Sequence, residues 1–148
     1  MAAGPFGREK SVLSSSASSR CEALRGVSPR SGVRALAEAC TGITTIYLAG
    51  CTQITDAGVA ALAEGCPQLT ALDLSFNWIH ASGMRSIGAA LTRHCVPRLK
   101  TLNLGNNHGG DEGIDHLSVA LQLGGCRALQ VLDISFNQGA RCMQHLAM

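Results

Sequence analysis

The chain has 148 residues, which is enough for one domain with a sizeable core. Apolar residues make up 46% of it but aromatic residues only 3%, so we expect an aliphatic core. The net charge of +2 argues against a dedicated nucleic-acid binder, and no apolar run approaches the roughly 18 residues that cross a bilayer. Seven cysteines without a secretion signal favour reduced thiols in an intracellular protein.

The N-terminal segment differs in composition from the rest. Residues 1–31 are rich in Ser, Gly, Ala and Arg and show no sustained periodicity, so we predict a disordered Ser/Arg-rich tail. Six Lys or Arg and two Glu lie within residues 1–34, which makes this end basic. A mitochondrial transit peptide is the alternative, although Glu9 and Glu22 count against it. We predict a cytoplasmic protein, with the nucleus as a second location.

From residue 43 onward, apolar residues recur at fixed spacing. The pattern L-x-x-L-x-L-x-x-(N/C) begins at Ile43, Leu69, Leu99 and Leu129, with spacings of 26, 30 and 30 residues. Repeats of this length are typical of solenoids. The later apolar positions of each match alternate with period two, which predicts a short strand with one face in a core.

A helical pattern follows each of the first three strands. Its apolar residues recur every three or four positions: Val59, Leu62 and Cys66; Met84, Ile87, Leu91 and Cys95; Ile114, Leu117 and Leu121. A glycine precedes each run, and Thr55, Asp56, Ser82, Asp111 and Glu112 are the candidate caps and first-turn residues. Each unit is therefore strand, turn, helix and return. Stacked units make a parallel sheet on one face and a row of helices on the other.

The two ends of the array, residues 32–148, differ from its middle. The stretch "GVRALAEAC" at 32–40 echoes "GVAALAEGC" at 58–66, so we predict a helical cap at 32–42. The repeat that starts at residue 129 is incomplete, because the chain ends eight residues after Ala140. We interpret this open end as a place for continuation of the array or for self-association.

These residues resemble the leucine-rich repeat family. The stretches "LTALDLSFNWIHASGMRSIGAAL" and "LKTLNLGNNHGGDEGIDHLSVAL" are similar to the ribonuclease-inhibitor type, and "ITTIYLAGCTQITDAGVAALAEGCPQ" to the cysteine-containing type of F-box proteins. The resemblance implies an α/β fold, a right-handed solenoid with four parallel strands on the concave face and helices on the convex face. It also implies protein binding, and an amide ladder formed by Asn77, Asn107 and Asn137.

The recurrent cysteines have a simpler interpretation. Cys40, Cys66 and Cys126 lie three residues before the next repeat and Cys95 lies four before it, which indicates a packing position at each helix end. Cys142-x-x-His145 is the nearest thing to a metal-ligand pair and lacks a second half. No assembled catalytic group is visible, so we predict no enzyme activity, no cofactor and no metal.

The outward strand positions are the candidate binding surface. Two columns should cross the strands, Tyr47–Asp73–Asn103–Asp133 and Thr45–Ala71–Thr101–Val131. Aromatic residues on a rigid polar surface are good binding anchors. We therefore predict a partner-binding site made of Tyr47, Asp73, Phe76, Trp78, Asn103, Asn106, His108, Asp133 and Phe136. For Phe76 and Phe136 the alternative is packing beneath the turns.

The function that follows is a protein-interaction module that binds through the concave face and rim. One alternative is the substrate-recognition component of an F-box-type ubiquitin-ligase complex, although no F-box is visible in residues 1–42. Another is a fragment of a longer regulatory scaffold, such as a GTPase-activating or receptor-type repeat protein. The partner is a protein of unknown identity, not a nucleic acid or a membrane.

Overall fold

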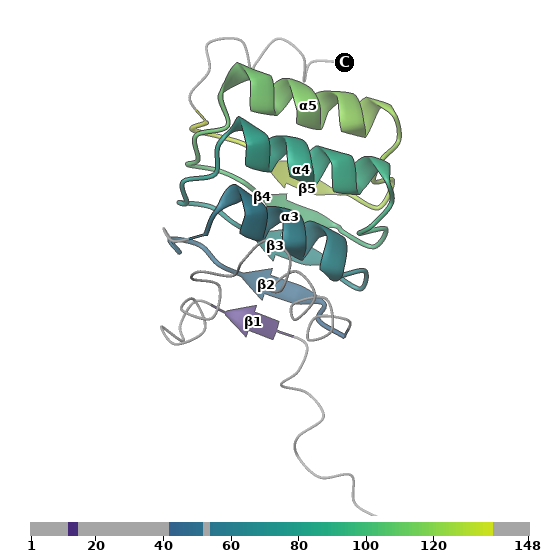
Figure 1. Cartoon of the computed structure of the whole chain (residues 1–148). Helices are drawn as coiled ribbons and strands as arrows, with labels where there is room; N and C mark the ends of the chain where they lie inside the picture. The colour runs from purple at the N-terminus through teal and green to yellow at the C-terminus, as the bar shows by residue number, and fades with distance from the viewer. Residues whose placement is uncertain (1–11, 15–41, 52–53, 138–148) are drawn as a thin grey trace, which may run out of the picture.

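A computed structural model describes residues 12–14, 42–51 and 54–137 of the chain. Within these ranges the strands are β1 (Val12–Ser14), β2 (Thr45–Tyr47), β3 (Ala71–Asp73), β4 (Thr101–Asn103) and β5 (Val131–Asp133). The helices are α3 (Asp56–Gly65), α4 (Ala81–Thr92) and α5 (Gly110–Gln122). The strands form one parallel sheet in sequence order, and the three helices lie side by side along one side of it (Figure 1).

The strand register follows the repeat alignment. Ile46 pairs with Leu72, Leu72 with Leu102, and Leu102 with Leu132, so equivalent positions of successive repeats lie next to one another. The predicted strands and helices occur in the predicted order. The prediction of an α/β solenoid built from stacked strand–helix units is therefore confirmed.

The sequence analysis does not predict strand β1. It lies in the segment predicted to be disordered and extends the sheet by pairing Leu13 with Ile46. Three residues are too few to show a period-two pattern, so the sequence carried no signal for this strand. The rest of the 1–31 tail, residues 32–41 of the predicted cap and the end after Asn137 lie outside the described residues.

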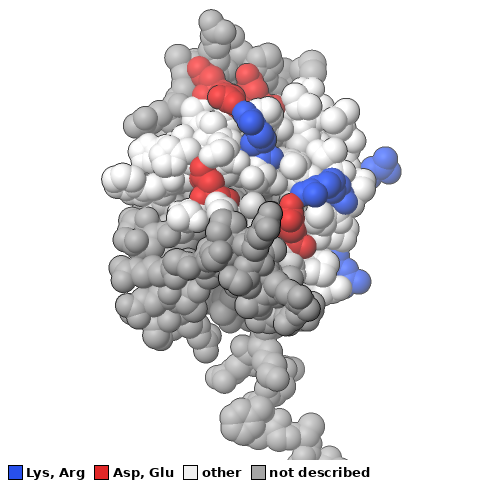
Figure 2. Space-filling model, in the orientation of Figure 1, with Lys and Arg blue, Asp and Glu red and all other residues white. Residues whose placement is uncertain are grey.

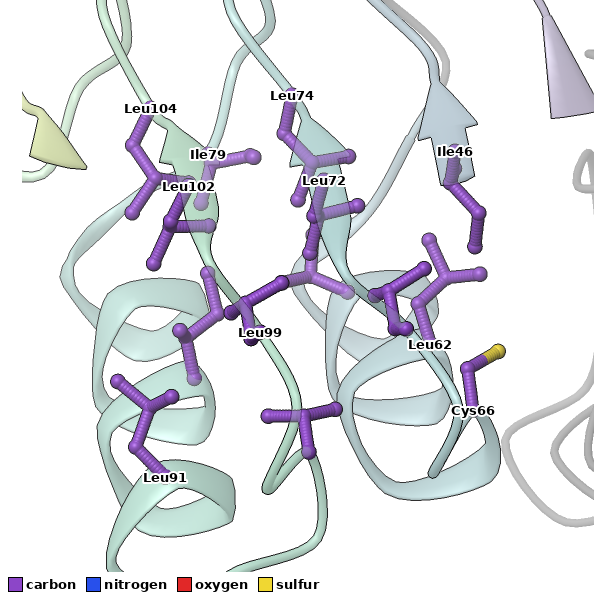
Figure 3. Close-up of a cluster of buried hydrophobic side chains, with 14 of the residues drawn as sticks. Ile46, Leu62, Cys66, Leu72, Leu74, Ile79, Leu91, Leu99, Leu102 and Leu104 are labelled. Carbon is purple, nitrogen blue, oxygen red and sulfur yellow. The ribbon is translucent and has the colours of Figure 1, made fainter. Parts of the chain in front are cut away.

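An aliphatic interior fills the space between sheet and helices. Ile46, Leu72 and Leu102 project from neighbouring strands toward the helices and form one buried cluster with Leu62 and Leu91 (Figure 3). Full burial of such a side chain contributes about 1.5–3 kcal/mol relative to leaving it in water. In the fourth repeat the equivalent side chains are only partly buried: Leu129, Leu132 and Ile134. The interior is thus complete in the middle of the array and thinner at β5.

The helix starts are joined across repeats. Thr55 is the N-cap of α3 and accepts a hydrogen bond from the Gly58 N–H at 3.2 Å, as predicted. Ser82 does not cap α4; its hydroxyl donates to Asp56 Oδ2, while the His80 N–H donates to Asp56 Oδ1 at 3.1 Å. A carboxylate of one repeat therefore holds the start of the next helix, where negative charge is favourable.

The asparagine ladder is present. The Asn107 side-chain amide donates to the carbonyl oxygens of Leu74 and Leu104, both at 2.9 Å, and its Oδ1 accepts from the Ile79 N–H at 3.1 Å. Asn137 repeats this arrangement one unit later. Each buried amide thus satisfies backbone groups of its own turn and of the preceding repeat.

The cysteine positions are mostly as predicted. Cys66 and Cys126 are buried at the return to the sheet, which confirms their packing role. In the second repeat Val96 fills that place, because it lies three residues before Leu99, whereas Cys95 lies four residues before it and is only partly buried. Cys95 and Cys126 are free thiols, but Cys51 is disulfide-bonded, so the expectation of reduced thiols is wrong at that position.

Candidate functional site

The side of β2–β5 that faces away from the helices is here named the sheet face. It carries the two predicted columns: Tyr47, Asp73, Asn103 and Asp133 in one, and Thr45, Ala71, Thr101 and Val131 in the other. No described helix covers this face (Figure 1). Tyr47 is 46% exposed and Val131 is 54% exposed, which leaves an apolar group at each side of a polar centre.

The polar members of the first column also stabilise the turns that follow the strands. Asp73 Oδ1 accepts from the Ser75 N–H at 2.9 Å and from the Ser75 hydroxyl at 2.7 Å. Asn103 and Asp133 accept equivalent backbone hydrogen bonds at 3.0 and 2.9 Å. The hydroxyl and N–H of Ser135 lower the pKa of Asp133, so this carboxylate is ionised at neutral pH. The column is therefore fixed in position and negatively charged.

The residue before each ladder position has a left-handed backbone. The φ angles are +71° at Gly50, +55° at Phe76, +55° at Asn106 and +54° at Phe136. Glycine and asparagine tolerate this conformation, whereas a bulky side chain there costs about 1–2 kcal/mol. Phe76 is 61% exposed and Phe136 is 80% exposed. The two phenylalanines therefore do not pack beneath the turns; strained backbone holds both rings in water.

A second aromatic group lies beside Phe76. Trp78 is 61% exposed, and its ring meets His108 of the next repeat edge-on, with centroids 5.7 Å apart. His108 in turn stacks on His80, with centroids 5.8 Å apart and ring planes at 24°. His80 was not predicted, because aligning equivalent repeat positions overlooks diagonal neighbours. We define the aromatic rim as Phe76, Trp78, His80, His108 and Phe136.

Positive charge lies elsewhere on the molecule. The described Lys and Arg residues occur on α4 or on the segments that lead from a helix end to the next strand: Arg85, Arg93, Arg98, Lys100 and Arg127. Acidic residues at the helix starts include Asp56, Asp111 and Glu112. Figure 2 shows this separation on the helix side, with most acidic groups toward the end where the helices begin and most basic groups toward the other end.

Ion pairs on the helix side use part of this charge. Arg85 pairs with Glu112 and Arg93 with Glu64, in each case joining neighbouring repeats. Across residues 42–51 and 54–137, no three His, Cys, Asp or Glu side chains gather to hold a metal ion. Cys142 and His145 lie outside the described residues. None of the helices in the described part of the chain has the length and apolar character to cross a membrane.

Comparisons with known proteins agree with this architecture. Residues 39–63 and 65–88 match a family model described as leucine rich repeat. Among solved structures, the chain is similar to "Leiomodin-1 Actin-Binding Site 2 (ABS2)", with a TM-score of 0.58 and 23% sequence identity over 71% of this chain. The chain spans 64% of the length of that structure. A search of curated proteins found no match.

These findings define the class of fold. Residues 39–63 and 65–88 carry leucine-rich repeats, and the described part of the chain folds as an α/β leucine-rich-repeat solenoid. The finer resemblances to the ribonuclease-inhibitor type and to the F-box-protein type stay predictions. At 23% identity the similarity to the solved structure supports a shared fold but not a shared partner.

Proposed function

We propose that the chain is a protein-interaction module that binds its partner through the sheet face and the aromatic rim. The observation that carries this proposal is the exposure of Phe76, Trp78 and Phe136 on one row of turns. Large aromatic side chains bury much area at small entropic cost and dominate the energetics of interfaces. Here they stand on turns that the asparagine ladder has already ordered, so little further ordering is needed on binding.

The strained backbone adds to this argument. A phenylalanine in the left-handed region lowers stability, whereas the equivalent Gly50 and Asn106 fit it without that cost. Strain of this kind persists where surrounding structure imposes it, and it is concentrated at functional sites. The similar solved structure is named for an actin-binding site of leiomodin-1, which supports protein binding by this fold without identifying a partner for this chain.

A place in a ubiquitin-ligase complex and a place in a longer regulatory scaffold are finer versions of the same proposal. Both would use the sheet face and the aromatic rim to hold a protein. The first rests on the cysteine-containing first repeat, and the second on the ribonuclease-inhibitor-type repeats that follow it.

Affinity capture with mass spectrometry from intact cells tests the proposal. The full chain is compared with the double variant Tyr47→Ala/Trp78→Ala and with the control Val119→Ala/Leu123→Ala, which removes exposed apolar groups on and just after α5. We expect partners to be depleted by about tenfold or more with the first variant and retained with the control. Melting temperatures of all three proteins should agree closely, because the altered side chains are exposed.

Equal capture by the full chain and the Tyr47/Trp78 variant would contradict this assignment. So would failure of that variant to fold, because the two side chains would then be structural rather than contact residues. Loss of captured partners with the control variant alone would indicate that the binding surface lies on the helix side.

A further inference from the structure

We propose that the partner segment is basic, and that one of its arginine side chains enters between Phe76 and Phe136. This inference rests on the proposed function and adds the chemistry of the partner. Three features of the described residues carry it: the spacing of the two phenylalanines, the carboxylates beside them, and the absence of positive charge from this part of the described surface.

The spacing fits a cation held between two rings. Phe76 and Phe136 are two repeats apart, with Asn106 between them, and backbone hydrogen bonds continue the sheet into these turns. The Phe76 N–H donates to Gly105 O at 3.0 Å and the Asn106 N–H to Ser135 O at 2.8 Å. Neighbouring strands lie about 4.8 Å apart, so the two phenylalanines are separated by about 10 Å.

The two rings leave the backbone in the same way. The φ angles of Phe76 and Phe136 differ by one degree, so the two residues take the same left-handed conformation in equivalent turns. A cation midway between them lies about 5 Å from each phenylalanine. This is within the roughly 6 Å over which an aromatic face attracts a cation. Asn106, which lies between them in the row of turns, has a shorter side chain than phenylalanine.

The acidic groups lie next to this gap. Asp73 and Asp133 each lie three residues before one of the phenylalanines, and their hydrogen bonds in the described structure use Oδ1. An ionised carboxylate has two oxygens and about four acceptor positions, so each can also accept a hydrogen bond from a guanidinium group. Arginine is favoured over lysine because its planar group both stacks on aromatic rings and pairs with carboxylates.

The charge of the surroundings is complementary to such a ligand. Every described Lys and Arg lies on the helix side or at the edge where strands begin, and none lies among the residues of the sheet face or the aromatic rim. A basic segment therefore meets attraction at this face and no repulsion from a nearby cation. An acidic segment would meet the ionised Asp133 instead.

Fluorescence polarisation with labelled nine-residue Gly/Ser peptides tests this on the full chain. Four probes carry three Arg, three Lys, three Gln or three Glu at the same positions. We expect the Arg probe to bind best, the Lys probe several-fold more weakly, and the Gln and Glu probes about tenfold more weakly or not at all. Binding of the Arg probe should weaken as salt is added.

Two variants and their controls locate the site. Phe76→Asn/Phe136→Asn and Asp73→Asn/Asp133→Asn should each weaken the Arg probe by about tenfold. The controls Val119→Ala and Asp115→Asn remove an exposed apolar group and an exposed carboxylate on α5, and they should leave the affinity unchanged. Circular dichroism checks that every variant remains folded.

Equal binding of the Arg and Gln probes would overturn the inference, as would equal loss of affinity in the controls. The basic N-terminal segment of the chain is the competing occupant. If Arg25→Glu/Arg30→Glu/Arg34→Glu tightens binding of the Arg probe by about tenfold, that segment occupies the face and the proposal of a partner segment is wrong. Partner capture that depends on Tyr47 and Trp78, without preference among the probes, would refute this inference and leave the proposed function standing.

Discussion

The first repeat and the second repeat differ in the turn that follows the strand. In the second repeat the Ile79 N–H donates to Asn107 Oδ1 and so joins two repeats. The equivalent Ile54 lies one residue further from its ladder position, and its N–H donates to Cys51 O at 2.9 Å, within its own turn. One extra residue therefore turns a hydrogen bond between repeats into a local one.

This change leaves a buried hydrogen-bond acceptor of the neighbouring repeat unsatisfied. Asn77 donates to Leu48 O at 2.9 Å, as the ladder requires, but its buried Oδ1 has no hydrogen-bond partner in the described structure. An unsatisfied buried acceptor costs about 1–3 kcal/mol. The contact between the first and second repeats is therefore weaker than the contact between the second and third repeats.

Removal of the ladder asparagines one at a time tests this difference directly. Asn107→Ala should lower the free energy of unfolding by about 2–3 kcal/mol, because it leaves backbone groups of two repeats unsatisfied. Asn77→Ala should cost about 1 kcal/mol less, since its Oδ1 already lacks a partner. Urea denaturation monitored by circular dichroism measures both values. Equal losses would show that the two contacts have the same strength.

Glycines in the first turns of α3 and α4 give the next effect. A Cβ at Gly83 would lie 2.5 Å from Asp56 Oδ1 and 2.6 Å from Ile79 Cγ2, so Gly83→Ala should cost about 1–3 kcal/mol. At Gly58 the nearest atom is 3.7 Å away, and Gly58→Ala should stabilise the protein by about 0.5–1 kcal/mol. Thermal denaturation of the two variants measures both shifts. Shifts of the same sign would refute the contrast.

A further prediction concerns the strained turns. Phe76→Asn should raise the free energy of unfolding by about 1 kcal/mol, because asparagine tolerates the left-handed backbone that Gly50 adopts in the first repeat. The reverse change one repeat later, Asn106→Phe, should lower it by a similar amount. Chemical denaturation of this pair is the measurement. Destabilisation by Phe76→Asn would show that the ring contributes packing that outweighs the strain.

Much of the fold could be predicted because the repeats obey two simple periods. Alternation placed Ile46, Leu72 and Leu102 inside, and the same alignment placed Tyr47 and Asp133 in one outward column. These predictions depend on the local apolar pattern and on the strand register, and the same pattern occurs in every repeat. The aliphatic core and the asparagine ladder follow from the same alignment.

The features that escaped prediction depend on single residues or diagonal contacts. Strand β1 is too short to show a period, and the contact between His80 and His108 joins positions that do not correspond in the alignment. The exposure of Phe76 depends on a backbone angle that phenylalanine rarely adopts, so sequence left both alternatives open. The packing position holds Val96 and not Cys95, because the cysteine of the second repeat lies one residue before the aligned position.

The regular spacing of the turns has an evolutionary consequence. Phe76 and Phe136 are separated by two units of 30 residues, so duplication of one such unit between them would separate them by about 15 Å instead of about 10 Å. The hydrophobic interior would be copied intact, while the opening between the rings would become too wide for a single side chain. A change in the number of repeats therefore changes which ligand fits between the rings, although no residue of the interface is substituted.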